Sequence, residues 1–356
     1  MIKMKVKKVP VALLGIACAF SLSACLPEAS SSDSKPAQTT TTSSSVTTTT
    51  KPPKNINPLT GISDITPGTS VRPVAIMVGN NDRSRPQVGI DKADMYVEAE
   101  TQGGITRIMA VFSGVTRVPE KLGPIRSART PFILIAESLD SIYCHAGGSR
   151  TGKKLLQTAE VGNIDALYGI NNSAFWRDPT LRASKGLEYS MMTGGKKLDA
   201  RVKAFKFHTG AEKPSPFNYG ASTKGSGAGN KVQIRLSGLQ TASFSYDAVS
   251  GLYLKSNGTL ANGTAHKTMD GVTLTASNIF IIYAGKYSEN ERTIGFHLES
   301  GTGLLVTEGT SRQIRWNRTK GSLSFTEYDG SSLSVKAGKP YVCITDIGNA
   351  SKTVLL

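Results

Sequence analysis

A polar and apolar alternation with a period of two runs from Asp94 to Glu100 and is the most regular pattern in the chain. It predicts a strand with three carboxylates and a tyrosine on one face, because alternate side chains of a strand share a face. The Gly103–Gly104 pair suits a two-residue turn into a second, apolar strand. In the register of such a hairpin, Glu100 lies opposite Arg107, so opposite charges meet across the strands.

Strand and helix signals alternate on both sides of this hairpin, up to about residue 213. A helix is predicted to begin at Thr130, because threonine is a good N-cap and Pro131 suits the first helical position, and to end near Leu139. The other elements predicted in this region are strands over 73–78 and 142–146 and helices over 152–159 and 194–205.

Beyond residue 230 the pattern changes to short strands separated by Gly, Asn, Asp and Ser turns. This pattern is typical of an all-β sandwich or barrel-like module. A stretch rich in Pro, Ser and Gly over 214–229 indicates a linker. The predicted fold class is therefore α+β, with a mixed α/β N-terminal domain over 58–213 whose sheet contains the hairpin, and an all-β C-terminal domain over 230–356.

The first 24 residues have the pattern of a signal peptide. Four lysines precede an apolar run from Val9 to Ala24, which is too short and interrupted for a membrane span of about 20 apolar residues. Leu22–Cys25 forms a lipobox, the signal at which the prolipoprotein pathway attaches diacylglycerol to the cysteine thiol and cleaves before it. We therefore expect a mature chain that begins at Cys25 and is held by palmitate-type acyl chains on the extracytoplasmic face of the cell membrane.

The segment that follows the lipobox is expected to be a tether. Residues 30–54 are almost wholly Ser, Thr, Pro and Lys, and such a segment cannot bury a core. We therefore predict a disordered tether over 25–57. The sequence favours a plain spacer and leaves open whether its hydroxyl groups carry sugars.

Charge narrows the choice of partners. The formal net charge of the chain is +16, and it becomes +12 when the four signal-peptide lysines are removed. A basic surface favours anionic surroundings such as lipid headgroups or a cell-wall polymer. An envelope protein is a further possible partner. Nucleic acid is not an expected partner, because the predicted location is outside the cytoplasm and the charge is spread along the chain.

Two cysteines, Cys144 and Cys343, remain in the predicted domains. A disulfide between them is compatible with an extracytoplasmic location. Both lie in apolar, strand-like runs, where a free buried cysteine packs as a small hydrophobic residue. The sequence leaves both states open and favours free thiols.

Arg126 and Arg129 lie just before the predicted helix at Thr130, together with Ser127. The N-terminus of a helix disfavours positive charge and favours an anion. Two arginines at this position therefore need an anionic partner. Either the carboxylates of the preceding hairpin meet them in a buried polar network, or a phosphate or carboxylate of a ligand does.

His145 ends a predicted strand and opens a loop that contains Gly147 and Gly148. Loops at the C-terminal ends of strands hold ligand-facing groups in α/β folds, and a histidine bonded to the backbone fits the pattern equally well. Residues 147–154 nearly match a phosphate-binding loop, but Lys154 stands where Ser or Thr would hold Mg²⁺. No cofactor is expected, and no metal site, because the histidines lack ligand spacing.

Taken together, these motifs resemble the YerB-type lipoproteins of Gram-positive bacteria, a two-domain family of unestablished function. The resemblance rests on the lipobox, the Thr-rich tether, segments 83–89, 93–98, 103–107, 123–129 and 145–149, and the region around Arg315 and Trp316. The polar positions that this family shares correspond to Arg85, Glu98, Thr106, Arg107, Arg126, Ser127, Arg129, His145, Gly147 and Gly148. Leu187 and Glu188 depart from the family pattern of His and Asn, so no site role is expected for their segment.

Two functions fit these residues. The favoured one is a non-catalytic envelope lipoprotein that binds a wall-derived anionic or sugar ligand, or a membrane protein, through an Arg/Glu/His cluster. The alternative is a peptidoglycan or glycan hydrolase or lyase with Glu98 as general acid or base and His145 assisting. Whether the chain is an enzyme stays open. The predicted ligand-binding residues are Arg85, Glu98, Arg107, Arg126, Ser127, Arg129, His145, Gly147 and Gly148.

Overall fold

The structure is a computed structural model that describes residues 55–168, 173–222, 224–290 and 292–356. The predicted signal peptide, the lipobox with Cys25 and nearly all of the predicted tether lie outside the described residues. Within the described ranges, no helix is both long enough and apolar enough to cross a membrane. The described residues form one compact unit.

A mixed 11-stranded sheet joins strands from both predicted domains. From the N-terminal region come β1 (Pro73–Gly79), β2 (Met95–Gln102), β3 (Ile105–Ser113), β4 (Ile142–His145) and β5 (Gly162–Asp165). From the C-terminal region come β8 (Gly227–Ala228), β14 (Asn278–Ala284), β17 (Ser300–Thr307), β18 (Thr310–Thr319), β19 (Ser322–Glu327) and β20 (Pro340–Asp346). The order is β19-β18-β17-β14-β20-β2-β3-β1-β4-β5, with β8 paired to β18.

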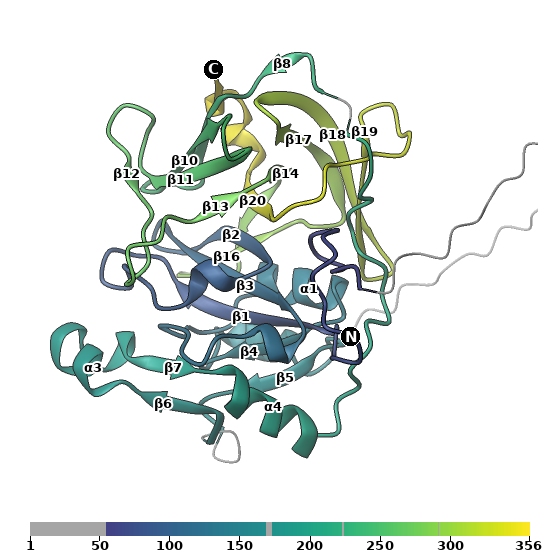
Figure 1. The fold of residues 1–356 in the computed structure, drawn as a ribbon. Coiled ribbons are helices and arrows are strands. Elements are labelled where there is room, and N and C mark those ends of the chain that lie inside the picture. Colours follow the sequence, from purple (N-terminus) through teal and green to yellow (C-terminus); the bar gives the residue numbers. More distant parts are fainter. Residues whose placement is uncertain (1–54, 169–172, 223, 291) are drawn as a thin grey trace, which may run out of the picture. The chain divides into compact units, whose positions relative to one another are not determined.

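The two regions meet where β2 and β20 pair as parallel neighbours. In this pairing Glu98 of β2 lies opposite Cys343 of β20. Figure 1 shows the blue strands of the N-terminal region continuing into the green and yellow strands of the C-terminal region. The all-β C-terminal region is confirmed, but part of it extends the N-terminal sheet. The predicted domain limits stay predictions.

The remaining strands form smaller sheets. A second, 6-stranded sheet contains β9 (Lys231–Arg235), β10 (Thr241–Asp247), β11 (Leu252–Asn257), β12 (Thr264–Ala265), β13 (Thr275–Ala276) and β21 (Val354–Leu355). Two-stranded sheets are formed by β6 (Phe175–Arg177) with β7 (Met191–Thr193) and by β15 (Lys286–Ser288) with β16 (Ile294–Phe296).

The helices are short and come mostly from the N-terminal region. They are α1 (Thr130–Ser138), α2 (Arg150–Leu155), α3 (Pro179–Lys185) and α4 (Gly195–Ala204), with 3₁₀ turns η1 (Ile90–Lys92), η2 (Val115–Arg117), η4 (Leu187–Tyr189) and η5 (Ile347–Lys352). The predicted helix at Thr130 is confirmed, but its N-cap is the extended Arg129 rather than Thr130. The Thr130 hydroxyl does not cap the helix and donates instead to Glu289.

Each face of the central sheet has its own hydrophobic core. On one face, Tyr96 of β2 belongs to a buried cluster with Phe244 of the second sheet. On the other face, Val97 belongs to a buried cluster with Phe132 of α1. Because side chains alternate along a strand, neighbouring residues of β2 and β3 serve different cores.

The prediction that Glu100 lies opposite Arg107 is wrong, because β2 carries a β-bulge. The register shifts between Glu100 and Gln102, and Ala99 takes the position opposite Arg107. Glu100 forms an ion pair with Lys286 at 3.1 Å instead. The alternating pattern predicts the strand, but it contains no signal for an inserted residue.

Cys144 and Cys343 are both free and buried. Burial raises the pKa of each thiol. The two side chains therefore pack as neutral, apolar groups, which is the state that the sequence favours.

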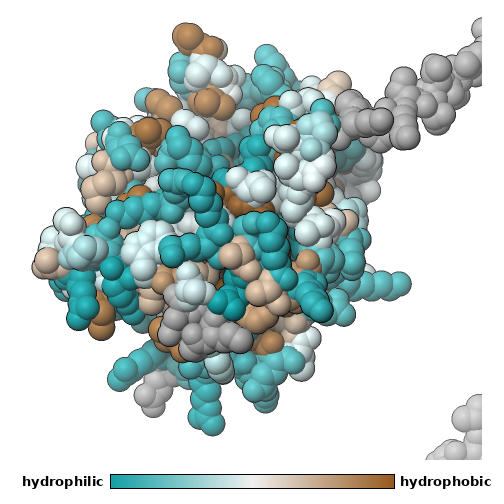
Figure 2. Space-filling model, turned by 60° about the horizontal axis from the view of Figure 1, so that its bottom comes forward, coloured by the Kyte–Doolittle hydropathy of each residue, from teal (hydrophilic) through white to brown (hydrophobic). Residues whose placement is uncertain are grey.

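The surface at the end of the molecule formed by α3, α4, β6 and β7 is mostly hydrophilic. In Figure 2 this end is turned forward, and apolar residues there are dispersed among hydrophilic ones. The functional site is therefore better sought among buried polar groups than on an apolar patch of this face.

Candidate functional site

Three arginines converge on the face of the central sheet that packs against α1. Arg107 comes from β3, and Arg126 and Arg129 come from the loop that leads into α1. The Nη1 group of Arg107 donates a hydrogen bond of 2.9 Å to the carbonyl of Ser127, which lies between the other two in the sequence. We call Arg107, Arg126 and Arg129 the arginine cluster.

The charges of the arginine cluster are buried and repel one another. The three residues are 3%, 9% and 6% exposed, respectively. Burial lowers the pKa of Arg107 well below its usual value, and the charges of Arg129 and Arg126 lower it further. Burial is also the main cause that lowers the pKa of Arg129 to about 10. Both shifts mean that the folded protein disfavours the charged guanidinium groups.

Carboxylates compensate this charge incompletely. Glu188 forms an ion pair with Arg126, and its backbone carbonyl accepts a second hydrogen bond from Arg126 at 2.9 Å. The Glu188 side chain is, however, 63% exposed. Among the described residues, no carboxylate oxygen lies within 4 Å of a guanidinium nitrogen of Arg107 or Arg129.

Arg129 is held by neutral groups. Its Nη1 donates to the carbonyl of Ala128 at 2.8 Å, and its Nη2 donates to the side-chain oxygen of Gln102. Its buried Nε has no hydrogen-bond partner in the described part of the chain. An unpaired buried N–H on a charged group is costly, so this donor is left unsatisfied in the folded chain.

Local features of the sheet make room for the cluster. Gly79 of β1 lies opposite Arg107, and a Cβ atom there would lie 3.1 Å from Cγ of Arg126 and 2.2 Å from Oγ of Ser84. A larger residue would therefore displace Ser84 and press on the Arg126 side chain. The β-bulge in β2 precedes Gln102, whose side chain reaches Arg129.

Ser127, Gly147 and Gly148 also lie beside the arginine cluster. The backbone N–H of Ala128 donates to the carbonyl of Gly147 at 2.8 Å, and Ala128 forms a parallel bridge with Gly148. Gly147 has a φ of 69°, which favours glycine. The backbone N–H groups of Ser127 and Gly148 form no hydrogen bond with the described residues and can donate to a ligand.

His145 lies next to this loop but is fully engaged. Its Nδ1 lies 2.8 Å from the carbonyl of Gly147, and its Nε2 lies 2.8 Å from the side-chain oxygen of Asn163. Asp165 is 3.8 Å from Nδ1 and accepts the backbone N–H of Gly147. His145 therefore shapes the glycine loop, as the backbone-bonded alternative predicts.

Glu98 lies on the opposite face of the sheet from the arginine cluster. Its Oε1 accepts hydrogen bonds from Asn80 at 2.7 Å and Thr106 at 2.8 Å, and its Oε2 accepts one from the Tyr341 hydroxyl at 2.6 Å. The Nζ of Lys255 is 3.5 Å from Oε2, and both charged side chains are almost completely buried. The predicted cluster is thus divided, with Glu98 in a separate buried network.

Arg85 belongs to the Glu98 side of the sheet. It donates to the carbonyl of Asn80 and pairs with the exposed Asp82. The remaining carboxylates of the predicted strand face pair with cations outside the arginine cluster, as Asp94 does with Arg117 at 2.6 Å. The hairpin carboxylates therefore do not neutralise the arginine cluster.

Comparison with known proteins accounts for most of the chain. Residues 59–208 match the N-terminal domain of the protein of unknown function DUF3048, and residues 232–342 match its C-terminal domain. The chain belongs to the DUF3048 family. It is 31% identical over 308 residues to YerB of Bacillus subtilis (strain 168), a protein named as a lipoprotein. The alignment covers 83% of this chain and 87% of YerB.

The fold comparison agrees with this DUF3048 assignment. The crystal structure of YerB protein from Bacillus subtilis matches with a TM-score of 0.71 and 26% sequence identity, covering 84% of this chain and 98% of that chain. The resemblance to YerB-type proteins and the α+β fold class are thereby confirmed. The shared architecture is a mixed α/β N-terminal region followed by a C-terminal region of mostly strands.

In this DUF3048 protein, the η4 segment lies against the arginine cluster although no site role was expected for it. The ring of Tyr189 lies 5.1 Å from the guanidinium carbon of Arg126, beside the Glu188 ion pair. Glu188 is 62 residues from Arg126 in the sequence, so local pattern gives no sign of their contact.

Glu289 is, after Glu188, a second carboxylate near the arginine cluster of this DUF3048 protein that no sequence pattern indicates. It accepts hydrogen bonds from the hydroxyls of Thr130 and Thr151, and its charge acts on Arg129. It lies in the turn between β15 and β16, 159 residues after Thr130. Only the packing of the C-terminal region against α1 brings it there.

Proposed function

We propose that the chain is a lipid-anchored, extracytoplasmic envelope protein that binds a wall-derived anionic ligand at the arginine cluster. The observation that carries this proposal is the burial of three mutually repelling arginines whose only carboxylate ion-pair partner among the described residues is the exposed Glu188. A ligand with phosphate or carboxylate oxygens would supply the missing negative charge.

The energetics support a site that is completed by a ligand. Removing one charged side chain from water costs several kcal/mol, and the cost is offset only when partners satisfy its charge and donors. Arg107 has five N–H donors, of which one is used in the described structure, and Arg129 retains an unpaired Nε. Guanidinium groups bind phosphate and carboxylate through paired, charge-assisted hydrogen bonds.

An anion can reach the arginine cluster by replacing two side chains that hold it. Glu188 is exposed, and Gln102 is half-buried. Both offer oxygen atoms to the guanidinium groups, so each occupies a position that a ligand oxygen would take. The N–H groups of Ser127 and Gly148 then provide neutral donors at the rim.

The proposed location rests on the sequence and on the family. The lipobox at Leu22–Cys25 supports attachment of a diacylglyceryl group to Cys25, and the relative YerB is named as a lipoprotein. The tether over 25–57 would then hold the folded region near the wall. The net charge of +12 on the mature chain supports association with anionic envelope polymers.

The geometry favours binding over hydrolysis. A general acid or base must reach a proton of the substrate, whereas both oxygens of Glu98 accept hydrogen bonds from buried residues of the chain itself. His145 has a partner at each ring nitrogen. The hydrolase or lyase with Glu98 as acid or base is therefore retained as an outcome of the test.

The test is incubation of the full chain, in detergent micelles, with purified cell-wall fragments, followed by mass spectrometry of bound and cleaved species. The informative variant is Arg126→Gln, and its matched control is Arg83→Gln. Both arginines lie against the ring of Tyr189, at 5.1 and 5.2 Å, but Arg83 is exposed and outside the arginine cluster.

We expect the wild type and Arg83→Gln to retain an anionic fragment and Arg126→Gln to lose at least about tenfold in affinity. Equal retention by Arg126→Gln and the wild type would refute the site. Cleaved fragments that disappear in Glu98→Gln would establish the enzymatic alternative instead.

A further inference from the structure

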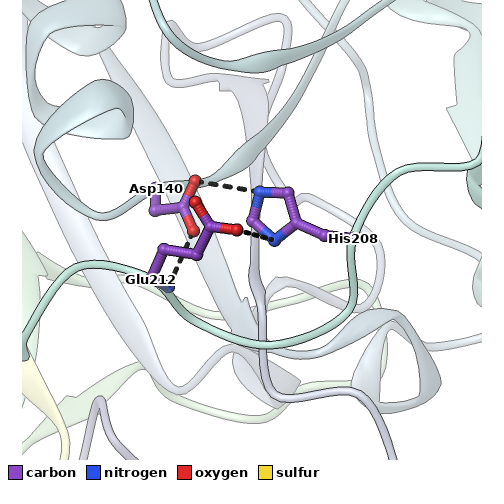
Figure 3. Close-up of side chains that lie close together, drawn as sticks. All are labelled: Asp140, His208 and Glu212. Atoms are coloured by element: carbon purple, nitrogen blue, oxygen red, sulfur yellow. Dashed lines mark hydrogen bonds and ion pairs between the residues drawn. The ribbon is translucent and has the colours of Figure 1, made fainter.

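A second polar cluster lies away from the arginine cluster, where the chain leaves α4. Asp140 follows α1, and His208 and Glu212 lie in the segment after α4. One potential ligand atom from each residue lies within 4.8 Å of the others, and Figure 3 shows the three side chains turned toward one another. The sequence predicts no metal site, because its histidines lack the spacing of metal ligands.

The hydrogen bonds of His208 fix which ring nitrogen is free. Its Nδ1 lies 2.9 Å from the carbonyl of Gly210, and a carbonyl can only accept, so Nδ1 carries a proton. In a neutral imidazole, Nε2 then carries no proton and presents a lone pair. This atom lies 3.4 Å from Oδ1 of Asp140. Two acceptors facing each other at this distance require a positive charge between them.

The spacing of these two acceptors suits a zinc ion. Zinc binds histidine nitrogen and carboxylate oxygen at about 2.0–2.2 Å in a tetrahedral arrangement, which separates two ligand atoms by about 3.4 Å. The proton that Nδ1 donates to Gly210 is the support that metal-bound histidines commonly have on their second nitrogen.

We propose that Asp140, His208 and Glu212 bind a zinc ion that fastens the segment after α4 to the end of α1. Nε2 of His208 and Oδ1 of Asp140 supply two ligands. Glu212 supplies the third after a change of its side-chain torsions, which costs little because this side chain is 71% exposed. Water completes the coordination from the adjoining cavity of about 450 Å³.

The surrounding charges are compatible with a cation. Arg72 donates to Oδ1 of Asp140 at 3.1 Å, but a carboxylate oxygen has two lone pairs and retains one for the metal. Oδ2 of Asp140 accepts the backbone N–H of Glu212, which orients the carboxylate. With neutral His208, the charges of Asp140, Glu212 and Arg72 sum to −1. Lys213 lies at the cavity wall, 3.6 Å from Glu160.

The competing explanation is a proton in place of the metal. A doubly protonated His208 would satisfy Asp140 and the Gly210 carbonyl, with Glu212 3.7 Å from Nδ1. The two explanations differ in a direct way, because only the metal explanation requires saturable binding of one zinc ion that depends on the His208 side chain. The site is also independent of the arginine cluster, so its test does not depend on the proposed function.

The test is calorimetric titration of zinc chloride into the untagged full chain in detergent micelles, after treatment with a chelator. The informative variants are His208→Gln, which removes a ligand, and Glu212→Gln, which alters an exposed side chain and so leaves folding intact. The control is His297→Gln, which removes an exposed histidine elsewhere.

We expect the wild type and His297→Gln to bind one zinc ion, His208→Gln to lose this binding, and Glu212→Gln to bind about tenfold or more weakly. Excess zinc should also raise the melting temperature of the wild type by about 2–4 °C or more and leave His208→Gln unchanged. Absence of saturable binding by the wild type, or unchanged binding by His208→Gln, would overturn the zinc site and leave the protonated histidine as the explanation.

Discussion

Glu98 and Arg107 point to opposite faces of the central sheet, although the pairing of β2 with β3 places them one position apart. Glu98 lies opposite Ile108, the neighbour of Arg107, and alternation along β3 turns the two side chains away from each other. One polar pattern in the sequence therefore produces two sites with different roles. Glu98 joins a buried network between the two regions, and Arg107 joins the arginine cluster.

The buried charge of Arg107 should make the folded protein less stable than an apolar side chain at the same position would. We expect Arg107→Met to leave the free energy of unfolding unchanged or to raise it by about 1–3 kcal/mol, because it removes a buried charge that Arg129 and Arg126 repel. We also expect inorganic phosphate to raise the melting temperature of the wild type and to raise that of Arg107→Met less. Thermal melting with and without phosphate measures both effects. A large loss of stability in Arg107→Met would show that the charge is already compensated.

Glu188 should compete with the ligand for Arg126. Replacing it in Glu188→Gln keeps the shape but weakens the ion pair, so we expect phosphate to bind several-fold more tightly. The free energy of unfolding should change by less than about 1 kcal/mol, because the carboxylate is largely exposed. Titration calorimetry measures the affinity, and Glu212→Gln is the control for loss of an exposed carboxylate elsewhere. Weaker phosphate binding in Glu188→Gln would contradict this role.

The Glu98–Lys255 pair should be essential to stability. Lys255→Met leaves the Glu98 carboxylate buried without its cation, which we expect to cost about 3–5 kcal/mol in the free energy of unfolding. The double variant Glu98→Gln with Lys255→Met should recover part of this loss. Urea denaturation of the two single variants and the double variant gives the coupling energy. Additive losses would mean that the two charges do not depend on each other.

Lys339 should make stability depend on pH above neutrality. Burial lowers its pKa from the ordinary value to about 8, even though its Nζ lies 5.3 Å from the Tyr96 ring. The unfolded chain therefore binds more protons than the folded one between about pH 8 and 10.5, and the contribution of Lys339 to stability rises with pH across this window. Lys339→Met should raise stability at pH 7 by about 1–3 kcal/mol and flatten this rise. Denaturation curves at several pH values check the slope, and an unchanged slope in the variant would contradict the assignment.

Cys25 should carry the membrane anchor. In a Gram-positive host fed a labelled fatty acid, we expect the wild type to incorporate the label and Cys25→Ser to remain unlabelled and unprocessed. Cys144→Ser is the control, because this thiol is buried and free. Labelling of Cys25→Ser at the wild-type level would refute the lipobox.

Local sequence patterns were sufficient to predict those strands and helices whose signals lie within a few neighbouring residues. The alternation over 94–100 predicted β2, and the Thr130–Pro131 pair predicted α1 to within one residue. The register of the hairpin was not predictable, because a β-bulge is defined by the partner strand rather than by the bulged strand alone. For the same reason, the pairing of β2 with β20 was not predictable from either strand.

The sequence by itself determined the α+β class, the all-β character of the C-terminal region and the concentration of arginine, serine and glycine around residues 126–129 and 147–148. Only the tertiary structure decided that Glu98 is separated from the arginine cluster, that Glu188 and Glu289 lie beside it, and that Asp140 meets His208. The physical reason is that local pattern reports which face of an element is polar, whereas ion pairs and ligand sets depend on contacts between segments up to 186 residues apart.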